Sequence, residues 1–160
     1  MPARPYRVVL FVALLAGVLS SPAFGANPAP YPGTHMMKTT LGFKALWDKL
    51  EAAVKANGMF VVTRASASGG AAGRGITIPG NLVIGVFRND YAVRMLAASV
   101  PAGIEAPLRF YVTENSDRTA SLTWRDPSAV FSPYGSAELD EMAVELDAIW
   151  RKIVTQATNG

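Results

Sequence analysis

The chain has 160 residues, a length that suits one domain built around a single core. It contains no Cys, so disulfide bonds and thiolate chemistry are excluded. Its 15 basic and 12 acidic residues give a net charge of +3. The basic residues form no stripe of the kind that binds a phosphate backbone, so we expect no nucleic-acid partner.

Residues 1–25 have the three-part pattern of a secretory signal peptide. Arg4 and Arg7 precede an apolar run over residues 8–19, and Ala23 and Gly25 are the small residues of a cleavage site. Cleavage after Gly25 would leave 135 residues with 13 basic and 12 acidic side chains, a net charge of +1. An uncleaved membrane anchor is the alternative, but the apolar run is shorter than the ~20 residues that span a bilayer. We therefore predict an exported protein, periplasmic or secreted, with no membrane span after cleavage.

Residues 26–35 are rich in Pro and predict an extended leader, and residues 36–160 predict one folded domain. Two long helices are expected in this domain, one from a cap at Thr40 to Gly58 and one from a cap at Ser136. Both have apolar residues at helical spacing. The first stripe holds Phe43, Leu46, Trp47, Leu50, Ala53 and Val54, and the second holds Leu139, Met142, Leu146, Ile149 and Ile153, flanked by Trp150. We expect Trp47, Leu50, Leu146 and Ile149 to be buried against a sheet.

Alternating or apolar runs predict strands over residues 36–40, 59–67, 81–87, 108–113 and 119–125. Residues 91–98 predict a short helix, and residues 127–131 predict a helical turn. The Gly-rich residues 68–75 predict a flexible loop, because they lack both the Lys-Ser/Thr pair of a phosphate loop and a following helix. The order of these elements predicts an α+β fold, in which an antiparallel-rich sheet has the two long helices packed on one face.

The last two predicted strands form a hairpin around the polar turn at residues 114–118. Alternation gives each strand an apolar face and a polar face. The apolar faces hold Leu108, Phe110, Val112, Leu122 and Trp124, and the polar faces hold Arg109, Tyr111, Thr113, Ser121, Thr123 and Arg125. The turn lacks Gly, so the sequence leaves the register between the two strands open.

Four short motifs surround this hairpin. They are Phe87-Arg88-Asn89-Asp90 after an apolar strand, the pair Met95-Leu96, the segment AGIEAPL at residues 102–108, and Trp124-Arg125-Asp126-Pro127. In this order they resemble the domain-of-unknown-function 302 family, over residues 36–134. Asp90 departs from the family pattern, in which Pro is common at that position. The resemblance implies a fold and no activity, because the function of the family is unknown.

His35 is the only His in the chain, and it lies beside the predicted leader. A Ser-His-Asp triad would have to use it, and a zinc site needs three or four ligands in a fixed geometry. We therefore expect no bound metal and no cofactor. His35, Met36 and Met37 together offer imidazole and thioether ligands that suit copper. Periplasmic copper handling is a minor alternative to the simpler interpretation of two Met residues that open a strand.

Four carboxylates, Asp90, Glu105, Glu114 and Asp126, lie near the predicted turns. Nothing in the sequence places two of them at a working separation for acid–base chemistry, so turn capping is the simpler interpretation. Arg109 alternates with better core residues, and Arg is almost never buried without a partner. It therefore meets solvent, pairs with Glu105 or Asp126, or binds an anionic ligand through its planar guanidinium.

These patterns favour a non-catalytic binding module for a small ligand, with anions among the candidates, or for a protein partner. The candidate ligand-binding residues are Arg109, Tyr111, Asp126 and Tyr134. The alternative is a hydrolase-like or other cleft enzyme that uses the same Arg and carboxylate groups; no residue is assigned a catalytic role. A deep cavity with converging polar groups and shifted pKa values would favour the enzyme. A second copy of the chain is a further candidate partner.

Overall fold

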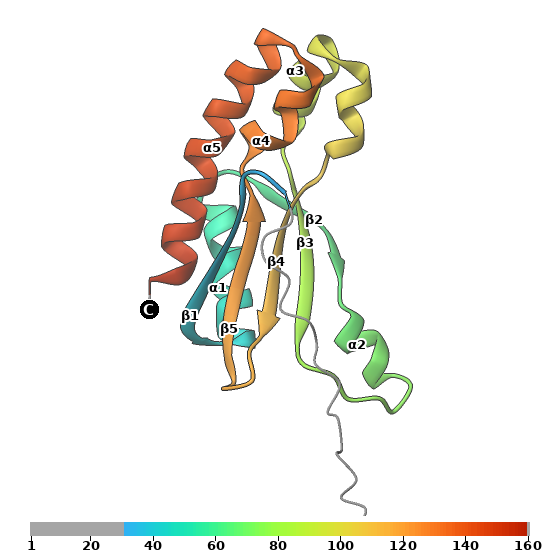
Figure 1. Cartoon of the computed structure of the whole chain (residues 1–160), viewed down its shortest axis with the longest axis vertical. Coiled ribbons are helices and arrows are strands. Elements are labelled where there is room, and N and C mark those ends of the chain that lie inside the picture. The colour runs from blue at the N-terminus through green and yellow to red at the C-terminus, as the bar shows by residue number, and fades with distance from the viewer. Residues whose placement is uncertain (1–30, 160) are drawn as a thin grey trace, which may run out of the picture.

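The computed structural model describes residues 31–159, so the predicted signal peptide and most of the predicted leader lie outside the described residues. Strands and helices follow one another along this part of the chain (Figure 1). The strands are β1 (Thr34–Gly42), β2 (Phe60–Ala65), β3 (Asn81–Phe87), β4 (Leu108–Glu114) and β5 (Thr119–Arg125). The α-helices are α1 (Phe43–Ala56), α2 (Ala67–Ala72), α3 (Asn89–Ala98), α4 (Pro127–Phe131) and α5 (Ala137–Thr158). Two 3-10 helices are η1 (Val100–Glu105) and η2 (Ser132–Tyr134).

The five strands form one antiparallel sheet in the order β1-β5-β4-β3-β2. Its centre is the predicted hairpin, whose register places Phe110 opposite Trp124 and Val112 opposite Leu122. The apolar faces of the two strands therefore coincide. The turn closes without Gly because Arg118 adopts a left-handed conformation with φ of 67°, and the Asp117 carboxylate accepts a hydrogen bond from the Thr119 amide at 3.1 Å.

The two long helices pack on one face of this sheet, which confirms the predicted fold class (Figure 1). Leu50 of α1 and Leu146 of α5 are buried as expected, and Trp47 and Ile149 are only partly buried. Trp150, predicted to flank the stripe of α5, is instead one of its main core residues. Its ring stacks on Phe110 of β4 with centroids 5.2 Å apart. Trp150 therefore lies on the face of α5 that packs against the sheet.

The start of the domain differs from the prediction. β1 begins at Thr34 and continues to Gly42, which faces Thr119 across the strand pair. Thr40 therefore lies within the strand, and Gly42 takes the cap position of α1. Pairing with β5 explains the longer strand, because the hydroxyl of Thr39 also donates a hydrogen bond to the Ala120 carbonyl at 2.8 Å.

The Gly-rich segment is not the loop that composition suggested, because it contains the short helix α2. The Ser66 hydroxyl accepts a hydrogen bond from the Gly69 amide at 3.0 Å, which caps the first turn. The side-chain carbonyl of Asn81, at the start of β3, accepts a second one from the Ala67 amide at 2.8 Å. The Ser66 and Asn81 side chains therefore stabilise a short helix in a segment whose glycines disfavour one.

A β-bulge between Val61 and Thr63 interrupts the alternation expected for the second strand. Val61 faces the helices opposite Val86, and beyond the bulge Arg64 does so opposite Ile84. Arg64 can therefore reach α1, where its guanidinium forms a bidentate ion pair with Glu51 at 2.7 and 2.8 Å.

No helix of residues 31–159 packs across the second face of the sheet. Met36 of β1 and Tyr111 of β4 lie on this open face with exposures of 60% and 38%. None of the helices in this part of the chain is long and apolar enough to cross a membrane. The open face is where the polar side of the hairpin meets solvent.

Candidate functional site

A cavity of about 260 Å³ lies at one end of the open face, where β4 begins, β5 ends and β1 begins. Its walls come from both strands of the hairpin and from the segments around that end of the sheet. They are formed by Leu108, Arg109, Phe110, Tyr111, Thr123, Trp124, Arg125, Tyr31, Thr34, Glu105 and Val130. Carbon atoms make up most of the wall surface, and the polar groups are few and concentrated on the strands.

Two arginines, Arg109 and Arg125, line this cavity. The hairpin register that pairs Phe110 with Trp124 places them opposite each other one residue further along. Side chains at such positions have Cβ atoms about 4.5–5.5 Å apart, and like charges there repel. Neither guanidinium forms an ion pair with a carboxylate of residues 31–159. The cavity therefore carries two positive groups, and neither is bonded to a counter-charge from the described part of the chain.

Two buried polar atoms beside this pair have no hydrogen-bond partner among the described residues. They are the Nε of Arg125 and the hydroxyl oxygen of Thr34. Thr34 faces Arg125 across the β1–β5 pair. The Nη2 of Arg125 makes only a long contact, 3.5 Å, with the Ala129 carbonyl. Because an unsatisfied buried polar group costs free energy, these atoms mark a place where a polar ligand atom or a water would be stabilised.

Two tyrosines add aromatic surface to the cavity. Tyr111 follows Arg109 on the same face of β4, and Tyr31 lies at the start of the described chain. The guanidinium carbon of Arg125 is 5.5 Å from the ring centroid of Tyr31, within the range of a cation–π contact. Gly33 holds this segment in place, because its carbonyl accepts a hydrogen bond from the Asp126 amide at 2.8 Å and a side chain on it would overlap Ala129.

Glu105 is the one carboxylate in the wall of the cavity. It does not pair with Arg109; one of its oxygens accepts a hydrogen bond of 3.0 Å from the Tyr134 hydroxyl. Burial and this contact with Glu105 both raise the pKa of Tyr134. The tyrosine therefore stays protonated at neutral pH and acts as a donor that positions Glu105.

Asp126 is next to Arg125 in the chain but points elsewhere. Its carboxylate lies 2.7 Å from Nε2 of His35, whose ring stacks on Trp124 with centroids 5.2 Å apart. Asp126 occupies the cap position of α4, yet its side chain makes no capping hydrogen bond. The His35–Asp126 contact links β1 to the end of β5. The Asp126 carboxylate therefore stabilises the fold at this position.

Of the four candidate residues, Arg109 and Tyr111 line the cavity and Asp126 and Tyr134 do not. Asp126 contacts His35, and Tyr134 donates to Glu105 of the cavity wall. The candidate set did not include Arg125, Thr34 and Tyr31. Alternation had placed Arg125 on the polar face of its strand, and a fixed hairpin register would have brought it opposite Arg109. Nothing in the sequence pattern indicated that Thr34 or Tyr31 would lie beside the hairpin.

The two Met residues considered for copper do not converge. Met36 faces Thr123 and Met37 faces Leu122, so their side chains leave β1 on opposite faces of the sheet. Within residues 31–159, no three His, Asp or Glu side chains form a cluster that could hold a metal ion.

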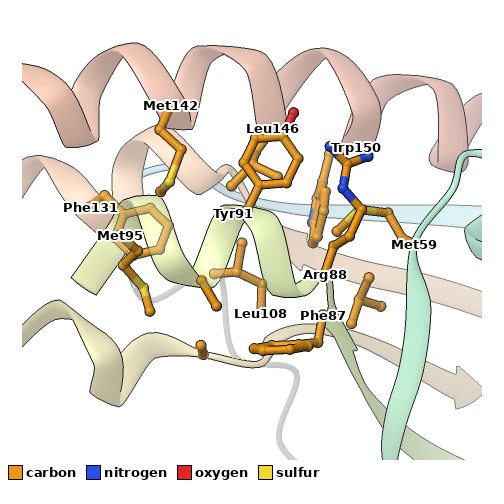
Figure 2. Close-up of a pocket in the computed structure, with 13 residues that line it drawn as sticks. Met59, Phe87, Arg88, Tyr91, Met95, Leu108, Phe131, Met142, Leu146 and Trp150 are labelled. Atoms are coloured by element: carbon orange, nitrogen blue, oxygen red, sulfur yellow. The ribbon is translucent and has the colours of Figure 1, made fainter. Parts of the chain in front are cut away.

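A second, much smaller cavity of about 30 Å³ lies between α3 and α5 on the helical side of the sheet (Figure 2). Tyr91, Met95, Met142 and Trp150 are among the side chains around it. The indole N–H of Trp150 is buried there without a hydrogen-bond partner among the described residues. A water needs about 10–15 Å³ of such volume, so this cavity has room for water only and is not a ligand site.

Comparison with known proteins supports the fold. The family described as "Domain of unknown function DUF302" matches residues 35–157. A crystal structure of an uncharacterized conserved DUF302 protein from Bacillus stearothermophilus superposes with a TM-score of 0.70 and 16% sequence identity. The similarity covers 79% of this chain and 98% of that one. A comparison with curated protein sequences finds no match.

Proposed function

The chain belongs to the DUF302 family, and we propose that this member is a non-catalytic binding protein for a small anionic ligand, held in the cavity between Arg109 and Arg125. One observation carries the proposal: the hairpin register, extended one residue beyond the Phe110–Trp124 pair, places Arg109 opposite Arg125, and both arginines line one cavity with no carboxylate of residues 31–159 bonded to either. We also propose that the protein is exported, on the signal-peptide pattern of residues 1–25.

The guanidinium pair supports anion binding on energetic grounds. Opposed like charges destabilise a strand pair, and an anion between them would turn this repulsion into attraction on both sides. Guanidinium groups also present their donors in a planar fork that matches a carboxylate or phosphate. The unpartnered Nε of Arg125 and hydroxyl of Thr34 add donors at the same place.

Binding without catalysis is favoured over the cleft enzyme because three of the candidate carboxylates are already engaged. Asp126 contacts His35, Glu105 accepts from Tyr134, and Asp90 forms a bidentate pair with Arg88. A general acid or base needs a free carboxyl group within reach of the reacting atoms. The cavity walls offer Glu105 alone.

Calorimetric titration with small carboxylates and inorganic phosphate at constant ionic strength tests the proposal. We expect at least one of these anions to bind the parent protein and to lose about tenfold or more in affinity in both Arg109→Gln and Arg125→Gln, because a hydrogen bond to a charged group contributes about 1.5–3 kcal/mol. Arg74→Gln is the matched control, since Arg74 is exposed, lies beyond α2 and does not line the cavity.

The proposal fails if no carboxylate or phosphate binds the parent protein. It also fails if the Arg74 variant loses as much affinity as the two cavity variants, since the anions would then respond to net charge alone. Thermal melts of each variant verify that the binding data come from folded protein.

A further inference from the structure

We propose that the ligand is a singly charged carboxylate with a compact ring, an aromatic or alicyclic monocarboxylate, rather than an inorganic anion. This inference rests on the proposed anion site and adds to it the chemical class of the ligand. It is drawn from three properties of the cavity: its charge, the surface of its walls and its volume.

The charged groups in the wall sum to one positive charge. Arg109 and Arg125 contribute two positive charges and Glu105 one negative charge. A monoanion would neutralise this set, whereas a phosphate dianion or a dicarboxylate would place an excess negative charge near Glu105. The Tyr134 hydroxyl donates a hydrogen bond of 3.0 Å to Glu105, which favours the position of this carboxylate in the wall.

The surface of the cavity wall favours a ligand with an apolar group beside its carboxylate. Most of it is carbon, and two aromatic residues take part, Tyr111 with 38% and Tyr31 with 63% of their surface exposed. Large exposed aromatic side chains beside polar donors are typical of sites that bury an apolar group while polar atoms fix its orientation. Acetate or phosphate would satisfy the guanidiniums and leave the rings in water.

The volume of the cavity indicates the size of this apolar group. An apolar cavity of about 150 Å³ accommodates benzene in an engineered protein. The present cavity of about 260 Å³ therefore has room for one six-membered ring and a carboxylate. Acetate would leave most of it filled with water.

Titration of the protein with benzoate, cyclohexanecarboxylate, acetate and inorganic phosphate tests this class of ligand. We expect both ring carboxylates to bind about tenfold or more tightly than acetate, because burying a ring removes apolar surface from water, and phosphate to bind no better than acetate. Tyr111→Ser should reduce the ratio of benzoate to acetate affinity, whereas Tyr111→Leu, which keeps apolar surface, should retain most of it. Phe60→Ser is the matched control, since Phe60 is an exposed aromatic on the edge strand β2 away from the cavity.

Three outcomes are distinguishable. Acetate or phosphate that binds as tightly as benzoate would overturn the ligand class and leave the anion site standing. A selectivity ratio that is unchanged in Tyr111→Ser, or reduced equally in Phe60→Ser, would also overturn it. Absence of binding by all four anions would overturn the proposed function itself. If the Tyr111 variants do not fold, the ligand series on the parent protein decides alone.

Discussion

At the scale of single residues, two groups of arginines differ in their partners. Arg64, Arg88 and Arg94 each form a bidentate pair with a carboxylate, and the pair of Arg64 with Glu51 lowers the pKa of that carboxyl. Arg109 and Arg125 line a cavity and have no such pair among residues 31–159. Guanidiniums that stabilise the fold and guanidiniums available to a ligand should respond differently to substitution.

Replacing Arg109 by Gln should leave the free energy of unfolding of the ligand-free protein unchanged or raise it by up to about 1 kcal/mol, because the variant removes a positive charge from the strand position opposite Arg125. Replacing Arg64 by Gln should instead lower it by about 0.2–1 kcal/mol, the range for exposed ion pairs, since Glu51 loses its partner. Urea unfolding of the two variants beside the parent protein measures both values. A loss of more than about 1 kcal/mol in Arg109→Gln, beyond the usual effect of a surface change, would mean that Arg109 has a structural role.

At the scale of elements, the sequence predicted the helices and strands that have a strong hydrophobic periodicity. It did not predict the local departures from regular structure. The stripe of α5, its Ser136 cap and the apolar strand β3 all follow from spacing and capping. The bulge after Val61 and the extension of β1 to Gly42 depend on pairing with neighbouring strands. The helix α2 depends on Asn81, which is distant in the sequence. Local propensity carries no information on such tertiary contacts.

The packing of α5 on α1 and the sheet can be tested with one pair of substitutions in the same helix. Leu146→Ala should lower the free energy of unfolding by about 2–5 kcal/mol, because Leu146 is 3% exposed and truncation leaves a cavity. Val144→Ala removes a side chain that is 61% exposed and should change it by no more than about 0.5 kcal/mol. Equal effects in urea unfolding would show that the buried face of α5 is not the one assigned.

At the scale of the whole molecule, the sheet is covered by α1 and α5 on one face and open on the other (Figure 1). The sequence predicted the polar side of the hairpin and two of the cavity residues, Arg109 and Tyr111. It could not predict the cavity, which also needs Thr34 from β1 and Glu105 from η1. Those residues meet only because β1 pairs with β5 and because η1 ends beside the start of β4.

The central claim is that an anion binds at Arg125 and Arg109, and the Nε–H group of Arg125 reports on it directly. This group is buried and has no hydrogen-bond partner among residues 31–159, so its proton and nitrogen resonances should respond to a bound carboxylate. In a two-dimensional NMR titration with benzoate, we expect a saturable shift of the Arg125 Nε–H signal, and in Arg109→Gln the same shift should require about tenfold or more benzoate. The Nε–H signal of Arg64, already bonded to Glu51, should stay in place. An Arg125 signal that does not move while benzoate reaches saturating concentrations, or one that moves together with Arg64, would contradict the account.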